Sequence, residues 1–219
     1  MRVDFEIDEN DEYQLQILLN KANDGDAESQ FILGLLHLQG LLAPKNKKEA
    51  FRWVRQAAEQ GYSKAQSELG SMYSNGVGIR KNKKTAARWF SNAAKQKDIC
   101  GLYNYALALH NGTGIKKNLK QAVKMYRLAA WQDNHGAQND LGIMYFNGEQ
   151  VSQNYKVAAH LFRRAAELGS LNGTLNLGIL YHEGLGVKQD YDIAAQYWTE
   201  AAELGHPNAE GLLELHEAA

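Results

Sequence analysis

Small and hydrophobic side chains return along this chain at a fixed step of 36 residues. A Leu-Gly pair marks four copies, and Tyr105-Ala106 keeps a small residue at the remaining place. The Leu-Gly pairs stand at 33–34, 69–70, 141–142 and 177–178. Ala-Ala pairs with the same step stand at 57–58, 93–94, 129–130, 165–166 and 201–202. A period that passes through five copies without an insertion predicts a tandem repeat protein.

Each copy has the periodicity of two helices. In the first predicted helix, which we call helix A, Leu69, Gly70 and Tyr73 share one helical face. In the second, helix B, Ala86 and Phe90 do the same. An asparagine or aspartate precedes every helix B and is expected to cap its first turn. These residues are Asn46, Asn82, Asn118, Asn154 and Asp190.

The predicted fold class is all-α, a right-handed α/α solenoid of tandem 36-residue helix-turn-helix repeats. A single helix pair cannot bury its own apolar face, so neighbouring repeats are expected to stack into one continuous core. The predicted divisions are an acidic N-terminal segment over 1–12 and a single solenoid over 13–219. The solenoid is expected to contain a half-repeat at 13–25, repeats at 26–61, 62–97, 98–133, 134–169 and 170–205, and a trailing half-repeat at 206–219.

The pattern resembles the Sel-1-like repeat family, whose repeats are related to tetratricopeptide repeats. The motif is complete in Ala65, Leu69-Gly70, Tyr73, Gly76-Val77-Gly78, Ala86, Trp89-Phe90 and Ala93-Ala94. Leu42 and Gln150 replace the second loop glycine in two copies, which leaves the local loop geometry open. The resemblance covers residues 13–218. It implies a protein–protein adaptor without catalytic activity or, alternatively, an inhibitor or immunity protein that neutralises a secreted toxin or enzyme.

A second stripe of helix A is the candidate partner-binding face, because the equivalent stripe of tetratricopeptide repeats lines their concave groove. The aliphatic members have an alternative interpretation, in which they pack against the next repeat as ordinary core. The aromatic and histidine members suit an interface, where large rigid side chains supply most of the binding energy. The stripe consists of Phe31, Leu35, Leu38, Tyr103, Leu107, His110, Asn139, Ile143, Phe146, Leu175, Ile179 and His182.

Charge is segregated along the chain although its net value is −1. Residues 1–42 carry −7, residues 43–130 carry +14 and residues 131–219 carry −8. The basic residues between helices A and B predict a ridge for an acidic protein partner, or else a solvated edge. Nucleic acid is a less favoured partner, because no aromatic residues interleave with the lysines. The ridge consists of Lys45, Lys47, Lys48, Arg80, Lys81, Lys83, Lys84, Lys116, Lys117 and Lys120.

The sequence contains little that indicates metal binding, a disulfide or catalysis. The seven histidines lack paired metal-ligand spacing, and Cys100 has no second cysteine with which to form a disulfide or a metal site. We therefore expect no metal, no cofactor and no enzymatic activity. The acidic N-terminus does not resemble a secretory signal, and no apolar run is long enough to span a membrane. We expect a cytoplasmic protein, and the sequence does not predict its oligomeric state.

Overall fold

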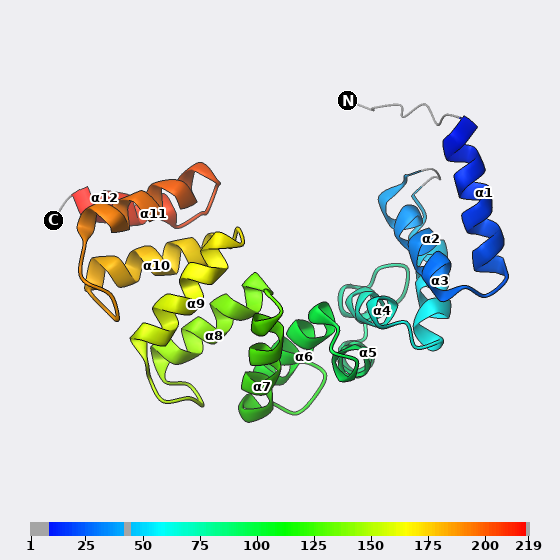
Figure 1. Ribbon diagram of the computed structural model, residues 1–219. Helices are drawn as coiled ribbons and strands as arrows, with labels where there is room; N and C mark the ends of the chain where they lie inside the picture. Colours follow the sequence, from blue (N-terminus) through cyan, green and yellow to red (C-terminus); the bar gives the residue numbers. More distant parts are fainter. Residues whose placement is uncertain (1–8, 42–44, 218–219) are drawn as a thin grey trace. The chain divides into compact units, whose positions relative to one another are not determined.

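The structure, a computed structural model, describes residues 9–41 and 45–217. This part of the chain forms twelve α-helices and no strands (Figure 1). The A helices are α2 (Ala27–Gln39), α4 (Ser63–Asn75), α6 (Ile99–Asn111), α8 (His135–Asn147), α10 (Leu171–Glu183) and α12 (Ala209–Glu217). The B helices are α1 (Glu9–Asn23), α3 (Lys47–Glu59), α5 (Lys83–Lys95), α7 (Leu119–Trp131), α9 (Tyr155–Glu167) and α11 (Tyr191–Glu203). The expected all-α architecture of alternating A and B helices is confirmed.

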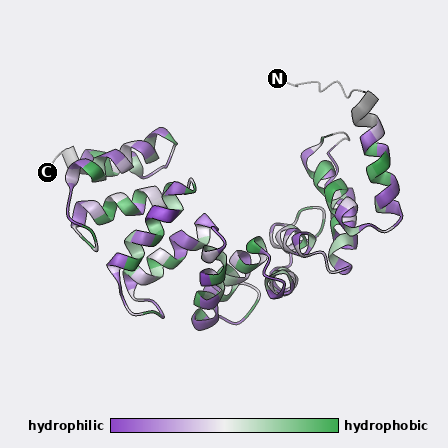
Figure 2. Cartoon of the chain, viewed as in Figure 1, coloured by the Kyte–Doolittle hydropathy of each residue, from purple (hydrophilic) through white to green (hydrophobic). Residues whose placement is uncertain are grey.

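The helices gather in two compact units. Unit 1 covers residues 1–117 and contains α1 to α6, while unit 2 covers residues 118–219 and contains α7 to α12. Within each unit every helix packs against the next one in the chain. The A helices α4 and α6 are also in contact in unit 1, as are α8 and α10 in unit 2. Hydrophobic residues alternate with hydrophilic ones along the helices, as expected where one face packs and the other meets water (Figure 2).

Side-chain caps fix where the B helices α3, α5, α7, α9 and α11 begin, as the sequence predicted. Asn46 Oδ1 accepts hydrogen bonds from the backbone N–H groups of Lys48 and Glu49 at 3.1 and 3.2 Å. The other four predicted caps accept from the backbone three residues ahead, and they are Asn82, Asn118, Asn154 and Asp190. Each cap satisfies backbone donors that the first helical turn leaves without a partner.

Glycines on helix A allow helix B to approach closely. A Cβ atom on Gly70 would lie 2.5 Å from the ring of Phe90, and one on Gly178 would lie 2.5 Å from Trp198 Nε1. Both distances are shorter than any van der Waals contact, so a larger residue would force the helices apart. This contact explains why glycine recurs in the middle of helix A, where its helix propensity is poor.

The ends of the elements differ in detail from the sequence expectations. Helix α1 begins at Glu9, four residues before the predicted half-repeat, and α12 begins at Ala209. Gln150, which replaces a loop glycine, adopts the same left-handed backbone at φ +58°. The loop geometry that the sequence left open is therefore kept at this position without glycine. Leu42, the other replacement, lies outside the described residues.

Candidate functional site

The helix-A stripe of unit 1 consists of two half-buried apolar groups on α2 and α6, with α4 between them in the chain. Phe31, Leu35 and Leu38 belong to α2, and the ring of Phe31 contacts that of Tyr62 with centroids 5.5 Å apart. Helix α4 contributes serines at the equivalent positions. The members on α6 are half-buried, and they are Tyr103, Leu107 and His110. The stripe of unit 1 is therefore interrupted by polar positions on α4.

The helix-A stripe of unit 2 has buried and accessible members. Asn139 and Leu175 are buried, and Asn139 Oδ1 accepts a hydrogen bond from Asn176 Nδ2 at 2.9 Å. Ile143 keeps 38 % of its surface exposed. Phe146, Ile179 and His182 are half-buried. Asn139 and Leu175 therefore lie beneath this surface, and the four accessible residues form it.

Two tyrosines extend the unit 2 stripe, and the sequence analysis did not select them. Tyr155 and Tyr191 are the first residues of α9 and α11. The ring of Tyr155 meets Phe146 at a centroid distance of 5.3 Å, and the ring of Tyr191 meets that of His182 at 5.2 Å, both edge to face. The 36-residue step between the two tyrosines is visible in the sequence, but the loop contact that brings each one beside helix A is not. The two pairs form matching aromatic ledges on successive repeats.

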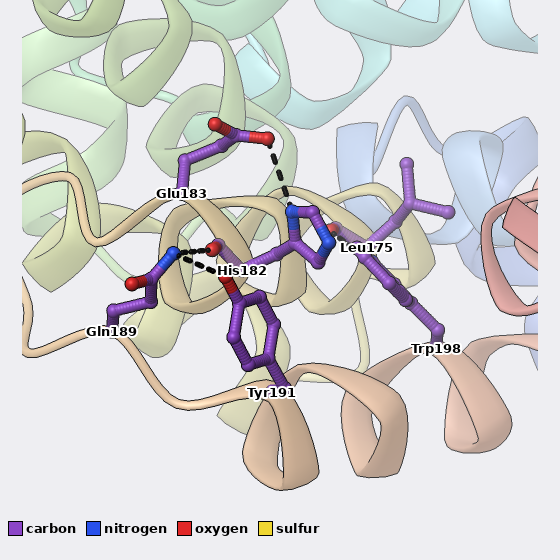
Figure 3. A network of polar contacts seen from close by, with 6 residues as sticks. All are labelled: Leu175, His182, Glu183, Gln189, Tyr191 and Trp198. Atoms are coloured by element: carbon purple, nitrogen blue, oxygen red, sulfur yellow. Dashed lines mark hydrogen bonds and ion pairs between the residues drawn. The ribbon is translucent and has the colours of Figure 1, made fainter. Parts of the chain in front are cut away.

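Polar contacts fix the second ledge in place (Figure 3). His182 Nδ1 lies 3.0 Å from Glu183 Oε1. Gln189 Nε2 donates to the backbone oxygen of His182 at 2.8 Å and to the hydroxyl of Tyr191 at 2.9 Å. Trp198 packs on the imidazole from below the surface, with ring centroids 5.4 Å apart. The orientation of the ledge is therefore set before any partner arrives, which lowers the entropic cost of binding.

The predicted lysine ridge lies on the A-to-B loops and the first turns of the B helices. All its members are exposed except Lys83, which is half-buried and donates to Ser74 Oγ at 2.9 Å. A Cβ on Gly78 would collide with the backbone oxygen of Lys47, and one on Gly114 with that of Lys83. The loops that contain Gly78 and Gly114 therefore each pack directly on the preceding helix B. This packing brings nine ridge residues together, while Lys120 belongs to unit 2.

A shallow recess of about 200 Å³ lies between α4, α5 and α6 in unit 1. Its floor includes Phe90 and Leu107, and Lys83 and Asn111 stand at its rim. Binding sites for small molecules generally measure about 300 to 1,000 Å³. The recess has room for a single side chain of a partner.

A metal site and a reactive thiol each place requirements on the remaining reactive groups. Across residues 13–41 and 45–214, no three side chains of His, Cys, Asp and Glu are grouped to hold a metal ion. Desolvation raises the pKa of the Cys100 thiol, and the nearby carboxylates of Asp98 and Glu68 add to this effect. A raised pKa keeps the thiol protonated and weakly nucleophilic. No helix within the described ranges combines the length and apolar character that crossing a membrane requires.

The comparisons with solved structures agree on the fold. A protective antigen of uropathogenic Escherichia coli with an SLR fold is 35 % identical, with a TM-score of 0.83 over 91 % of this chain and 43 % of that one. This chain therefore spans less than half the length of that antigen. A Sel1 repeat protein from Oxalobacter formigenes is 33 % identical, with a TM-score of 0.81 over 86 % of this chain and 75 % of that one.

More distant structures share the fold alone. An immunity protein from Pseudomonas aeruginosa is 20 % identical, with a TM-score of 0.52 over 95 % of this chain and 74 % of that one. No curated protein matches the chain significantly. The model of the Sel1 repeat matches five segments, at residues 27–62, 63–98, 101–134, 135–170 and 172–206. These matches cover most of the sequence, and the chain accordingly belongs to the Sel1 repeat family.

Proposed function

We propose that this chain is a protein-binding scaffold that holds a partner on its helix-A face, with the aromatic ledges of unit 2 as anchors. Membership of the family supports the general role, because Sel1 repeat proteins generally act as protein-interaction scaffolds without enzymatic activity. The observation that carries the specific proposal is the repeated ledge, formed by Phe146 with Tyr155 and by His182 with Tyr191.

The ledges have the properties of binding hot spots. Tyr191 keeps 50 % of its surface exposed, and Ile143 beside Phe146 on α8 keeps 38 %. Aromatic side chains lose little conformational entropy on binding, and these rings are already held by edge-to-face contacts. Gln189 and Glu183 border the second ledge with polar atoms that can select among partners. A partner with protruding apolar side chains at matching spacing fits this surface.

The experiment compares capture of partners by the wild-type chain and by a ledge variant, Phe146→Ala/Tyr191→Ala, in extracts of the native cell. Each truncated hot spot is expected to cost about 2 kcal/mol, so the partner seen with the wild type should be retained at least about tenfold more weakly. Quantitative mass spectrometry measures retention, and circular dichroism verifies that helicity is unchanged.

The matched control is Leu128→Ala, which removes a similarly exposed side chain from helix B of the same unit. This control should retain the partner fully. Equal retention by wild type and ledge variant would refute the proposed face. Several substoichiometric partners would fit an adaptor, whereas one partner held at nanomolar affinity would fit an inhibitor or immunity protein. Nucleic acid released by a small rise in salt would instead favour binding through the lysine ridge.

A further inference from the structure

Three large apolar side chains stand exposed where the B helices of unit 2 end. Trp131 is the last residue of α7 and keeps 84 % of its surface exposed. Leu168 and Leu204 follow the last residues of α9 and α11 and are 43 % and 60 % exposed. Single exposed apolar residues are ordinary on a protein surface. Leu168 and Leu204 occupy equivalent repeat positions and Trp131 stands one position earlier, so an exposed apolar side chain lies at the end of every helix B of unit 2.

Acidic side chains flank this apolar row. Glu167 and Glu203 are the last residues of α9 and α11, and both are exposed. Asp133 lies two residues beyond the end of α7 and pairs with Arg164 in the last turn of α9. A carboxylate at a helix C-terminus is opposed by the helix dipole, at a cost of about 0.3 to 1 kcal/mol. We call the row with its carboxylates the acidic edge.

The lysine ridge of unit 1 shows the opposite arrangement. Lys47 and Lys83 are the first residues of α3 and α5, where the helix dipole disfavours positive charge. The exposed Arg80, Lys81, Lys116 and Lys117 continue the ridge. Ile79 adds an exposed apolar side chain between them. Both surfaces thus carry charges that their own helices disfavour, and contact between the two surfaces would compensate both costs.

The two surfaces also share a spacing. Because each is built from the same 36-residue repeat, one step along the acidic edge of unit 2 equals one step along the ridge of unit 1. On the acidic edge Glu167 and Leu168 are followed one repeat later by Glu203 and Leu204, and on the ridge Lys81 is followed by Lys117. A second copy of this chain supplies such a match automatically, whereas an unrelated partner would need this pitch by chance.

We propose that this chain self-associates, with the acidic edge of unit 2 in one copy docked on the lysine ridge of unit 1 in another. The carboxylates of Glu167 and Glu203 meet Lys81 and Lys117, and Trp131, Leu168 and Leu204 are buried against the aliphatic stems of the ridge. Long basic side chains cover apolar surface well with these stems. The contact joins different patches, so copies close into a ring or pair if the geometry permits and otherwise continue as a chain.

The test uses charge reversal and its rescue. The full chain is examined by light scattering and sedimentation from micromolar to submillimolar concentration. Its association should weaken strongly between about 0.1 M and about 1 M salt, where screening shortens from about 10 to about 3 Å. The variants Glu167→Lys/Glu203→Lys and Lys81→Glu/Lys117→Glu should each associate at least about tenfold more weakly. An equimolar mixture of the two variants should restore association.

Two further measurements make the outcome specific. The control Asp192→Lys reverses a carboxylate in the first turn of α11, at the other end of that helix from Glu203, and should associate like the wild type. Emission of Trp131 should shift to shorter wavelength with concentration, and Trp131→Ser should remove that shift. A monomer throughout the range at low salt would overturn the proposal, as would a failure of the mixed variants to associate. Capture of a basic protein by monomers through the acidic edge would show that another partner covers it.

Discussion

Units 1 and 2 are built from the same repeat but differ at the ends of their helices. Both keep the side-chain caps of helix B and the glycines where helices A and B meet. At the start of helix B, unit 1 presents Lys83 bonded to Ser74, and unit 2 presents Tyr191 in edge-to-face contact with His182. The positions that define the fold are thus repeated, and the positions at its edges have diverged into a basic surface and an aromatic one.

The opposite ends of the helices show a second difference. In unit 1, Gln60 donates to Gln30 at 2.8 Å and Gln96 to Gln66 at 2.9 Å, so each B-to-A turn is bonded to the helix behind it. In unit 2 the equivalents of Gln96 are Gln132, which donates to the backbone oxygen of Leu128, and Leu168 and Leu204, whose side chains are exposed. A polar bond that stabilises unit 1 is therefore absent at the turns of Leu168 and Leu204 in unit 2, where apolar surface stands instead.

The largest expected effect tests whether the two units unfold separately. Gly78→Ala combines a left-handed backbone with a collision against the backbone of Lys47, so it should cost about 3 kcal/mol or more. Repeats interact mainly with their neighbours, so faster amide hydrogen exchange should be concentrated in unit 1. Gly186→Ala creates the same collision with Tyr155 and should act in unit 2.

Gly61→Ala is the control for this pair. Gly61 also has a positive φ, at +95°, but an added Cβ would meet nothing within 4 Å. Its substitution should cost about 1 to 2 kcal/mol from backbone strain alone. Equal destabilisation of both units by Gly78→Ala would show that the chain unfolds as one cooperative block.

The second largest effect is expected when the hydrogen bond between Gln96 and Gln66 is removed from unit 1 and its equivalent is introduced into unit 2. Gln96→Leu removes the donor to the buried Gln66 Oε1 and should cost about 1 to 3 kcal/mol. In unit 2 the buried Gln138 Oε1 has no hydrogen-bond partner among the described residues, and Leu168 stands where the donor would be. Leu168→Gln should therefore stabilise unit 2 by about 0.5 to 1.5 kcal/mol.

Chemical denaturation of the two variants measures these opposite changes. Leu204→Gln is the control for added polarity at a turn, because its equivalent partner position holds Thr174, which already donates to the backbone oxygen of Ser170. This control should leave the free energy of unfolding nearly unchanged. A loss of stability in Leu168→Gln would mean that Gln138 cannot reach the new amide.

The sequence was sufficient for the features that repeat and insufficient for those that depend on contact across repeats. The caps at Asn46 and Asp190 follow from a polar residue before an apolar period, so they could be predicted. The ledge of Phe146 and Tyr155 joins two helices through a loop. The spacing of residues within one helix does not predict such a contact. The exposure of Trp131 likewise depends on the conformation of the turn that follows α7.

A smaller effect concerns the turn that ends helix B. Lys97 and Asp133 adopt φ +63° and +59° where other copies have glycine. Lys97→Gly should relieve about 1 to 2 kcal/mol of strain, partly offset by a more flexible unfolded chain, for a net gain of about 0.5 kcal/mol. Asp133→Gly also loses the ion pair with Arg164, which is worth up to about 1 kcal/mol, so unit 2 should gain nothing. Thermal unfolding of both variants checks this contrast, and equal gains would assign no stability to the ion pair.

The smallest effect is expected at Glu68 on α4, whose equivalents are Ile32, Asn104, Asp140 and Asn176. Burial raises the pKa of the Glu68 carboxyl, so the folded chain holds its proton more tightly than the unfolded chain does. Stability from this group is then highest at low pH and declines as the pH rises from the ordinary glutamate range, about 4.3, through the raised pKa.

Glu68→Gln should therefore raise the melting temperature at neutral pH and have little effect near pH 4, as differential scanning calorimetry can measure. Glu59→Gln, which changes an exposed carboxylate bonded to Arg55, should show no such gain at neutral pH. A gain for Glu68→Gln that is equal at both pH values would mean that packing of the amide, rather than desolvation of the charge, is responsible.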